Sequence, residues 1–280
     1  MAGIRVVTDS ACDLPAALAE EHEIDIVPLT IRFGEEELVD RRDLSPKEFW
    51  ARVDSSPVLP ETAAPSPGAF EEAYRRAAAA GCPGVVCCTL ASGLSATFQA
   101  ATVAAQAVAD VIPVRVVDTR SVTLAEGMMA VAAARVAAQG KGIDDVAGAV
   151  QDIVIRARLF ATMDTLENLK KGGRIGSAQA FFGSLLSVKP VIELRDGAVE
   201  AESRQRTRSK SLRYLVDKLR QYDRVENLAV LHGDAPDIDE FLDLVGELYP
   251  RDEIILGDVG AVIGAHTGPR VIGIAFQVPQ

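Results

Sequence analysis

Hydroxyl side chains follow several apolar runs of this chain. One such segment, residues 92–97, comes after the apolar run 85–89 and before a helical pattern. Backbone N–H groups at the start of a helix point toward a bound anion, and the hydroxyls of Ser92, Ser95 and Thr97 would add donors. The segment is therefore a candidate anion site. In the simpler alternative, Ser92 caps the helix and Ser95 lies in its first turn.

The same segment comes close to the nucleophile elbow of serine hydrolases. Gly93 and Ser95 fit that pattern, but Thr97 replaces the final glycine, which normally lets helix and strand pack closely. His266 lies downstream in the expected order, within residues 264–269, for which the glycines predict a loop. A single loop histidine is more often structural, yet its glycine neighbours allow a ligand to approach. A serine esterase using Ser95 and His266 is one alternative function.

Other site types find no support in the sequence. The four cysteines are Cys12, Cys82, Cys87 and Cys88; they form no CxxC pair, so we expect neither a disulfide framework nor a metal site. Residues 170–176 lack the order of a P-loop, and no GxGxxG follows a predicted strand. We therefore expect no cofactor. A regulatory protein that binds a small ligand is a further alternative, because sheets of this general type bind many ligands.

The chain is acidic, with a net charge of −11, and this argues against nucleic acid as a partner. The charge is uneven, because residues 156–220 hold 14 Lys or Arg against 7 Asp or Glu. Arg204, Arg206 and Arg208 alternate at strand spacing and would share one face. Such a run is usually a solvated surface, but in an acidic protein it also fits the docking of a partner.

Apolar runs alternate with helical patterns along the chain. β-Branched runs without polar alternation predict a parallel sheet buried on both faces. Strands are expected at residues 4–7, 24–33, 85–89, 114–117, 159–163, 188–194, 198–203, 228–232, 254–257 and 271–278. Helices are expected at residues 13–21, 46–53, 68–80, 94–109, 124–139, 209–221 and 237–248.

The pattern predicts an α/β protein with two domains. The first, residues 1–157, would hold a mostly parallel, doubly wound sheet. Composition shifts after Arg156, and Asp196-Gly197 between two apolar runs predicts a type I′ hairpin. A second α/β domain with a mixed sheet is therefore expected at residues 158–280. Residues 60–68, with three prolines, are expected to form a loop.

Nothing at the beginning of the sequence resembles a targeting signal. The chain enters an apolar, strand-like run at residue 4 without a charged leader or a signal core. No apolar run approaches the roughly 20 residues that a membrane span needs. We therefore expect a cytoplasmic protein.

Taken together, the segments resemble the DegV family. The similarity runs in order from residue 4 to near the end of the sequence. It rests on Thr8-Asp9-Ser10 with Asp13-Leu14-Pro15, Leu59-Pro60-Glu61-Thr62 with Pro65-Ser66-Pro67-Gly68, residues 92–100, Val117-Asp118-Thr119, residues 165–176, Arg206-Thr207-Arg208-Ser209-Lys210, and Gly260 with residues 264–270.

The resemblance implies two α/β domains that hold a long-chain fatty acid between them. Such proteins are the non-catalytic, fatty-acid-binding subunit of bacterial fatty acid kinase. A separate ATP-dependent kinase subunit phosphorylates the bound acid, and the acyl phosphate enters phospholipid synthesis. Transient contact with a membrane surface is compatible with this role.

The resemblance also assigns residues. The carboxylate ligands of the family map onto Thr62, Ser95 and His266, with Ser92 as the alternative to Ser95. The usual family residues beside these ligands are replaced by Ala63, Ala64 and Ala96, which bears on the preference for particular acids. Two further sets complete the expected sites. Because a hydrocarbon tail needs an apolar lining, the tail contacts are expected to be Phe181, Phe182, Leu185 and Leu186, with ordinary core as the alternative. From the basic segment, docking on the kinase subunit is expected to use Arg174, Arg204, Arg206 and Arg208, with pairing to Glu200 and Glu202 in the same domain as the alternative.

Overall fold

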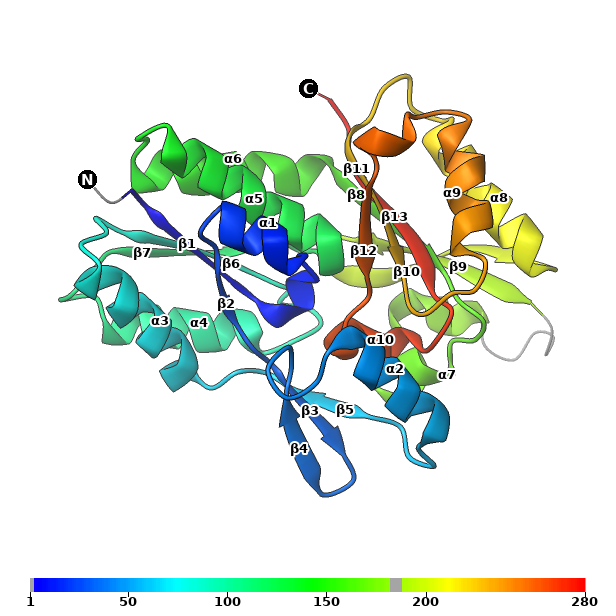
Figure 1. The fold of residues 1–280 in the computed structure, drawn as a ribbon, viewed down its shortest axis with the longest axis horizontal. Coiled ribbons are helices and arrows are strands. Elements are labelled where there is room, and N and C mark those ends of the chain that lie inside the picture. The colour runs from blue at the N-terminus through cyan, green and yellow to red at the C-terminus, as the bar shows by residue number, and fades with distance from the viewer. Residues whose placement is uncertain (1–2, 182–187, 280) are drawn as a thin grey trace.

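The computed structural model describes residues 3–181 and 188–279. It is an α/β protein built on two large sheets and one small sheet (Figure 1). The predicted fold class is confirmed. Among the residues that the structure describes, no helix is long and apolar enough to cross a membrane.

The first sheet is entirely parallel, as its β-branched runs predict. Its central strand β6 is buried at every position, because helices cover both faces. In order across the sheet the strands are β2 (Asp25–Val27), β1 (Arg5–Asp9), β6 (Val85–Thr89) and β7 (Val114–Asp118).

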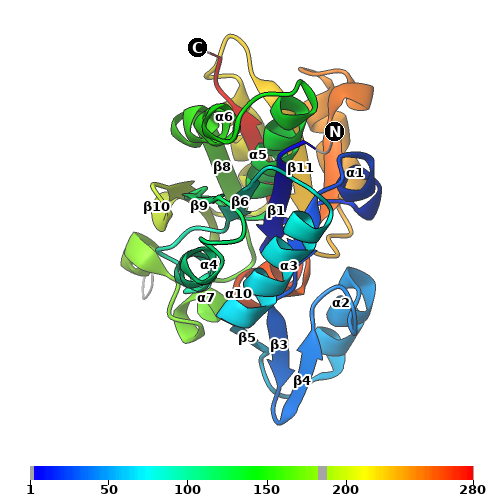
Figure 2. The same ribbon diagram turned by 90° about the vertical axis from the view of Figure 1, so that its left-hand side faces the viewer.

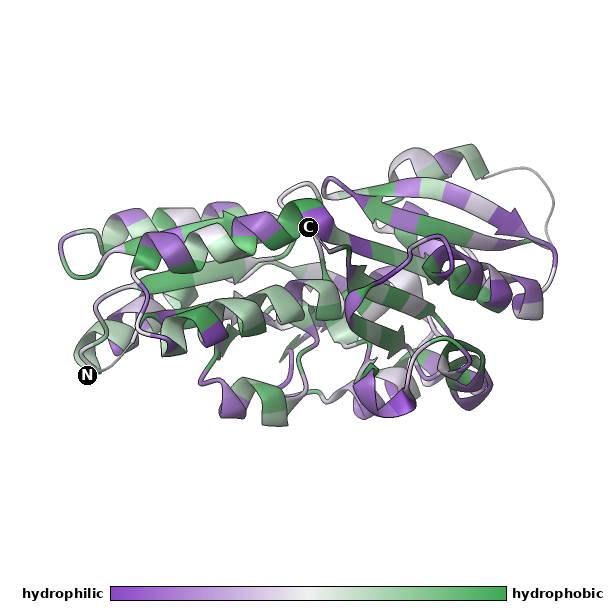
Figure 3. Cartoon of the chain, turned by 90° about the horizontal axis from the view of Figure 1, so that it is seen from above, coloured by the Kyte–Doolittle hydropathy of each residue, from purple (hydrophilic) through white to green (hydrophobic). Residues whose placement is uncertain are grey.

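Helices cover this sheet in two layers (Figure 2). One layer consists of α3 (Pro67–Ala79) and α4 (Thr97–Ala107), and the other of α5 (Thr123–Ala138) and α6 (Ile143–Arg156). In Figure 3 the strands of this sheet are largely hydrophobic, whereas the outer helices alternate in hydropathy. The short helix α1 (Ala16–Glu21) follows β1 and the 3₁₀ turn Ser10–Cys12.

The second sheet is mixed, with one parallel pair, β11 and β12. In order across the sheet its strands are β10 (Ala198–Gln205), β9 (Lys189–Arg195), β8 (Ala157–Thr162), β13 (Ile272–Gln277), β11 (Glu226–His232) and β12 (Ile255–Asp258). The predicted hairpin joins β9 to β10. Asp196 and Gly197 have φ values of 50° and 76°, as a type I′ turn requires.

Helices α8 (Arg208–Leu219) and α9 (Ile238–Gly246) cover one face of the second sheet, and the turn Arg251–Glu253 precedes β12. The other face packs against α5, which contacts strands of both large sheets. One hydrophobic core therefore runs through both halves of the molecule. The proposed domain boundary at residues 157 and 158 stays a prediction.

A small antiparallel sheet lies beside the junction of the two large ones (Figure 1). It consists of β4 (Glu36–Val39), β3 (Thr30–Phe33) and β5 (Glu61–Ala63). Nearby lie α2 (Pro46–Ser55), α7 (Glu167–Lys171), the turn Gly176–Phe181 and α10 (Ala261–Thr267).

Two predicted loops contain regular structure instead. Residues 60–68 contribute strand β5, because Thr62 pairs with Ile31 of β3. Residues 264–269 contain the end of helix α10. A Cβ atom at Gly264 would lie 2.6 Å from the ring of Phe49, so this glycine allows the helix to pack closely against α2 rather than ending it.

Candidate functional site

A cavity of about 190 Å³ lies between the first and second sheets. Its walls are mostly aliphatic, and side chains from the loops of the first sheet meet strands of the second. The lining consists of Leu29, Thr62, Ala64, Leu90, Leu94, Ser95, Ala96, Val122, Thr123, Leu159, Ala161, Leu169, Arg174, Ile192, Leu194, Val199, Leu231, Val259, Val262, Ile263, His266, Thr267 and Val271.

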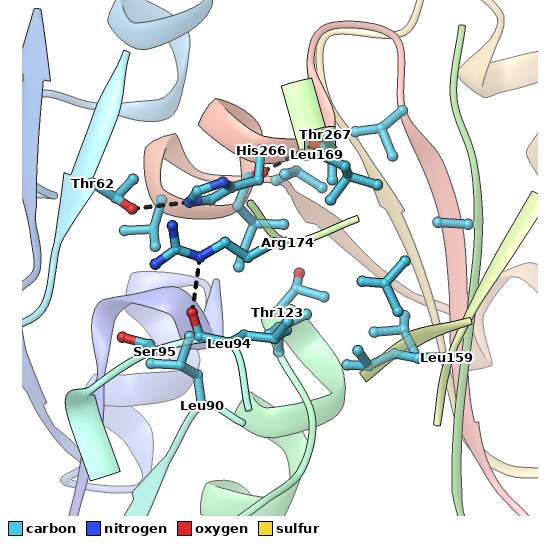
Figure 4. A pocket seen from close by; sticks show the side chains of 18 of the residues that line it. Thr62, Leu90, Leu94, Ser95, Thr123, Leu159, Leu169, Arg174, His266 and Thr267 are labelled. Carbon is cyan, nitrogen blue, oxygen red and sulfur yellow. Dashed lines mark hydrogen bonds between the residues drawn. The ribbon is translucent and has the colours of Figure 1, made fainter. Parts of the chain in front are cut away.

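Polar side chains gather at one end of this cavity (Figure 4). Thr62 comes from β5, Ser95 from the loop before α4, and His266 from α10. The Thr62 hydroxyl oxygen lies 2.9 Å from His266 Nε2. The three predicted carboxylate ligands, which are far apart in the sequence, thus line one cavity.

The imidazole of His266 is neutral at physiological pH. Burial, reinforced by the positive charge of Arg174, lowers the pKa of His266 to about 4. Nδ1 is buried and has no hydrogen-bond partner in the described part of the chain. Because an unpaired buried N–H is rarer than an unpaired acceptor, the network assigns the proton to Nε2. Nε2 then donates to Thr62, whose own hydroxyl proton is free for a ligand.

Gly172 allows this placement of the ring. A Cβ atom at Gly172 would lie 2.5 Å from His266 Nδ1, so no larger residue fits there without moving the histidine. Gly172 also accepts a hydrogen bond from Nη1 of Arg174 through its carbonyl oxygen. One glycine therefore positions two side chains at the polar end.

Arg174 lines the cavity, although its sequence context suggested a docking surface. Its Nε donates to the carbonyl oxygen of Leu94 at 3.1 Å. Figure 4 shows its guanidinium between His266 and the loop that carries Ser95. The side chain of Arg174 therefore lies at the polar end of the cavity, and its role in docking stays a prediction.

The loop before α4 separates the two candidate serines. Ser95 and Ala96 line the cavity, and the Ser95 hydroxyl oxygen lies 2.8 Å from that of Thr97. Ser92 is exposed and donates to the Asp118 carboxylate at 2.5 Å. The alternative in which Ser92 caps the helix is wrong, because α4 begins at Thr97, after Ala96. Ser95 is therefore the serine that faces the cavity.

The pairing of these hydroxyls bears on the esterase alternative. An elbow serine is activated by a hydrogen bond to its histidine. Here Ser95 is bonded to Thr97, and Nε2 of His266 is bonded to Thr62. The observed network therefore does not form a Ser95–His266 pair.

One of the four predicted tail residues can be placed, and it does not line the cavity. Phe181 packs beside the guanidinium of Arg204, 4.9 Å from its ring centroid, and is not among the residues that line the cavity in the described part of the chain. Phe182, Leu185 and Leu186 lie outside the described residues. Among the described residues, strands of the second sheet form an aliphatic wall of the cavity, and Leu159, Ala161, Ile192, Leu194 and Leu231 belong to it.

The basic run does not form one strand face. Strand β10 ends at Gln205, so Arg204 lies on the strand and Arg208 begins α8. Arg208 pairs with the Asp237 carboxylate at 2.8 and 3.0 Å and is largely buried. Arg204 and Arg206 are exposed. The prediction of a shared face is therefore wrong, because a helix begins within the run.

Two buried carboxylates anchor the segments that carry the site. Asp9 accepts from the backbone N–H of Leu90 at 2.9 Å, and Asp13 accepts from that of Gly260 at 3.0 Å. Leu90 precedes the Ser95 loop, and Gly260 precedes α10. Burial raises the pKa of Asp9 to about 7 and that of Asp13 to about 8.

Within residues 3–181 and 188–279, no group of three or more His, Cys, Asp or Glu side chains could hold a metal ion. The four cysteines are free and buried.

Comparison with known proteins places this chain in a family. The family model described as "Uncharacterised protein, DegV family" matches residues 3–278. A DegV domain-containing protein of Streptomyces coelicolor is 38% identical over 282 residues, which cover 98% of each chain.

Solved structures share the fold. A DegV family protein from Thermus thermophilus, described by its fatty acid binding, has a TM-score of 0.90 and 31% identity, with 99% of this chain and 100% of that chain covered. DegV of Bacillus subtilis, described as a fatty acid binding protein, has a TM-score of 0.88 and 30% identity, with 100% of both chains covered. A stearic acid-binding protein from Eubacterium ventriosum has a TM-score of 0.87 and 27% identity, with 98% of both chains covered. The chain belongs to the DegV family.

Proposed function

We propose that this protein binds a long-chain fatty acid in the cavity between its sheets. The carboxylate would lie at the end formed by Thr62, Ser95 and His266. The protein would present this carboxylate to a separate ATP-dependent kinase subunit, and the acyl phosphate formed there would feed phospholipid synthesis. In this proposal the protein has no catalytic activity by itself.

The aliphatic wall supports a fatty acid tail as the ligand. Residues such as Leu159, Ile192 and Leu231 offer no hydrogen bond that could orient a polar ligand. Each methylene that leaves water for such a wall contributes roughly 0.8 kcal/mol, so a sixteen-carbon acid gains about 11 kcal/mol before ordering costs are subtracted. The tail therefore supplies most of the affinity.

The polar end supports a carboxylate as the head-group. A buried carboxylate without partners would cost several kcal/mol. The Thr62 hydroxyl is oriented by His266, the Ser95 hydroxyl lines the same end, and Arg174 adds a positive charge. These groups offer the donors and the counter-charge that an ionised acid needs.

The observation that carries the proposal is this combination of an apolar cavity with oriented hydroxyls at one end. The relatives from T. thermophilus, B. subtilis and E. ventriosum, which are described as binding fatty acids, support the same class of ligand. Ala64 and Ala96 also line the cavity, and their methyl groups replace the usual family residues there. The preferred acid should therefore reflect a tighter and less polar head-group site.

The exposed arginines support the docking step. Arg204 and Arg206 are exposed on the surface, and Arg204 also lies over the ring of Phe181. Arg208 pairs with Asp237. A basic segment in a protein of net charge −11 would steer it toward an acidic surface of the kinase subunit.

Two assays test the proposal. Hexadecanoic acid should displace a fluorescent fatty acid from the purified protein at submicromolar concentration. Incubation with ATP and the kinase subunit should then yield acyl phosphate only when this protein is present. If hexadecanoic acid does not displace the probe, the proposed ligand is wrong. If binding occurs but acyl phosphate forms equally well without the protein, the presentation step is wrong.

A further inference from the structure

A second pocket, which we call the outer pocket, adjoins the ligand cavity. It has a volume of about 450 Å³. Two side chains line both spaces, namely Leu159 of β8 and Leu194 of β9. Both leucines are buried, with exposed fractions of 6% and 9%. They therefore stand between the two spaces.

Strand register explains this placement. Leu159 and Leu194 are direct partners across the antiparallel β8–β9 pair. Side chains two residues apart on a strand share one face, so the next pair on that face is Ala161 with Ile192. This next pair lines the ligand cavity and not the outer pocket. The leucine pair is thus the last one of the cavity on this side.

Residues that lie beyond the two leucines, on the side away from Ala161 and Ile192, line only the outer pocket. Ala157, at the start of β8, and Asp196, in the hairpin, line the outer pocket but not the cavity. The loop between β7 and α5 follows the same order. Its residues 119–121 line the outer pocket, and Val122 and Thr123 line the cavity. Two separate segments therefore mark the same boundary.

The two spaces differ in chemistry. Charged side chains belong to the outer pocket, namely Arg120, Arg158, Glu193, Arg195, Asp196 and Lys218. Such a lining holds water and offers little to a hydrocarbon chain. The cavity on the other side of the leucines is aliphatic. The leucine pair is therefore where the apolar surroundings of a tail would end.

The boundary lies at the far end from the polar groups. In Figure 4 Leu159 lies on the opposite side of the cavity from Thr62 and Ser95. From this arrangement, and resting on the proposed function, we infer that Leu159 and Leu194 form the end wall that meets the fatty acid tail and sets the longest acyl chain the protein accepts.

The test is a length series of saturated fatty acids, measured by displacement of a fluorescent fatty acid. For the wild type, affinity should rise about fourfold for each added methylene until the tail reaches the wall. Beyond that length, affinity should stop rising or fall. In Leu159→Ala and in Leu194→Ala, the limit should move to acids longer by about two methylenes, because each change removes about three carbon atoms from the wall.

Leu212→Ala is the matched control. Leu212 is also buried, but it packs in a separate core cluster and lines neither space. It should lower stability in a similar way and leave the length limit unchanged. Leu159→Val and Leu194→Val, which disturb the core less, provide the same test if an alanine variant fails to fold.

The outcomes separate this inference from the proposed function. If the wild type binds no fatty acid of any length, the proposed function is wrong, and the end wall has no ligand to meet. If the wild type binds but the limit stays at the same length in folded variants of Leu159 and Leu194, only the end wall is refuted. A limit that moves equally in Leu212→Ala would also refute it.

Discussion

Replacing Thr62 by Val tests the head-group site most sharply. The change removes one hydroxyl and keeps the β-branched shape, so the pairing of β5 with Ile31 of β3 should persist. The hydroxyl oxygen lies 2.9 Å from His266 Nε2 and lines the cavity. The variant therefore loses both a donor to the ligand and the acceptor that orients the histidine.

The expected loss follows from the bonds removed. A hydrogen bond to a charged group contributes about 1.5–3 kcal/mol, so the Kd for a fatty acid should rise roughly 10- to 150-fold. The neutral bond to His266 contributes about 1 kcal/mol to the folded protein, so the Tm should fall only by a few degrees.

Displacement of a fluorescent fatty acid gives the Kd, and Thr267→Val is the matched control. Thr267 lines the same cavity, but its hydroxyl donates to the carbonyl oxygen of Ile263 within α10. Its loss should change the Kd less than threefold. The reasoning is refuted if Thr62→Val binds within threefold of the wild type, or if Thr267→Val weakens binding as much.

Three further predictions concern ionisation and docking. In the folded protein the pKa of His266 is about 4, against an ordinary 6.5, so between these pH values only the unfolded chain takes up a proton. The ligand-free wild type should therefore lose stability relative to His266→Gln as the pH falls from about 6.5 to 4. Because burial raises the pKa of Asp13 to about 8 from 3.8, the wild type should lose stability relative to Asp13→Asn as pH rises from about 4 to 8. Arg206→Glu should slow acyl phosphate formation in the presence of the kinase subunit, as added salt should, and leave fatty acid affinity within about threefold, whereas Arg208→Glu should lower the Tm.

Urea unfolding across the pH range checks the first two predictions. If the difference in unfolding free energy between the wild type and His266→Gln does not change between pH 6.5 and 4, the imidazole is not neutral as described. If the difference in unfolding free energy between the wild type and Asp13→Asn stays constant up to pH 8, the carboxyl group of Asp13 is not protonated as described. For Arg206→Glu, an unchanged rate of acyl phosphate formation would remove this residue from the docking surface.

Features set by local pattern were predictable from the sequence. Strand β6 appears at residues 85–89, as its run of β-branched and small apolar residues predicts. Asp196-Gly197 predicts the β9–β10 turn, because both positions require positive φ. The positions of these elements follow from the types of residues that are neighbours in sequence.

Features set by distant contacts were not predictable in this way. Thr62 lies on a strand only because β3 supplies its partner, and the prolines around it suggested a loop. His266 lies on a helix because Gly264 packs against Phe49, although a glycine normally weakens a helix. The resemblance to a family identified Thr62 and His266 as site residues, but their elements depend on tertiary contacts.

The residues of the aliphatic wall could not be predicted from the sequence either. The strand that carries Leu159 was expected, yet the run 159–163 is apolar apart from Thr162, so its pattern does not tell which side chains face the cavity. Arg174 was assigned to a docking surface because it belongs to the basic segment of residues 156–220. Its side chain donates to the carbonyl oxygen of Leu94, 80 residues away in sequence, and this contact orients the side chain toward the cavity.

The central claim is that the cavity holds a fatty acid by its carboxylate. Native mass spectrometry of the purified protein, before and after incubation with hexadecanoic acid, tests it most directly. We predict one bound acid per chain, lost under denaturing conditions and markedly reduced in Thr62→Val at the same acid concentration. A wild-type mass that stays that of the bare chain after incubation, or equal occupancy in Thr62→Val at limiting acid, would contradict the claim.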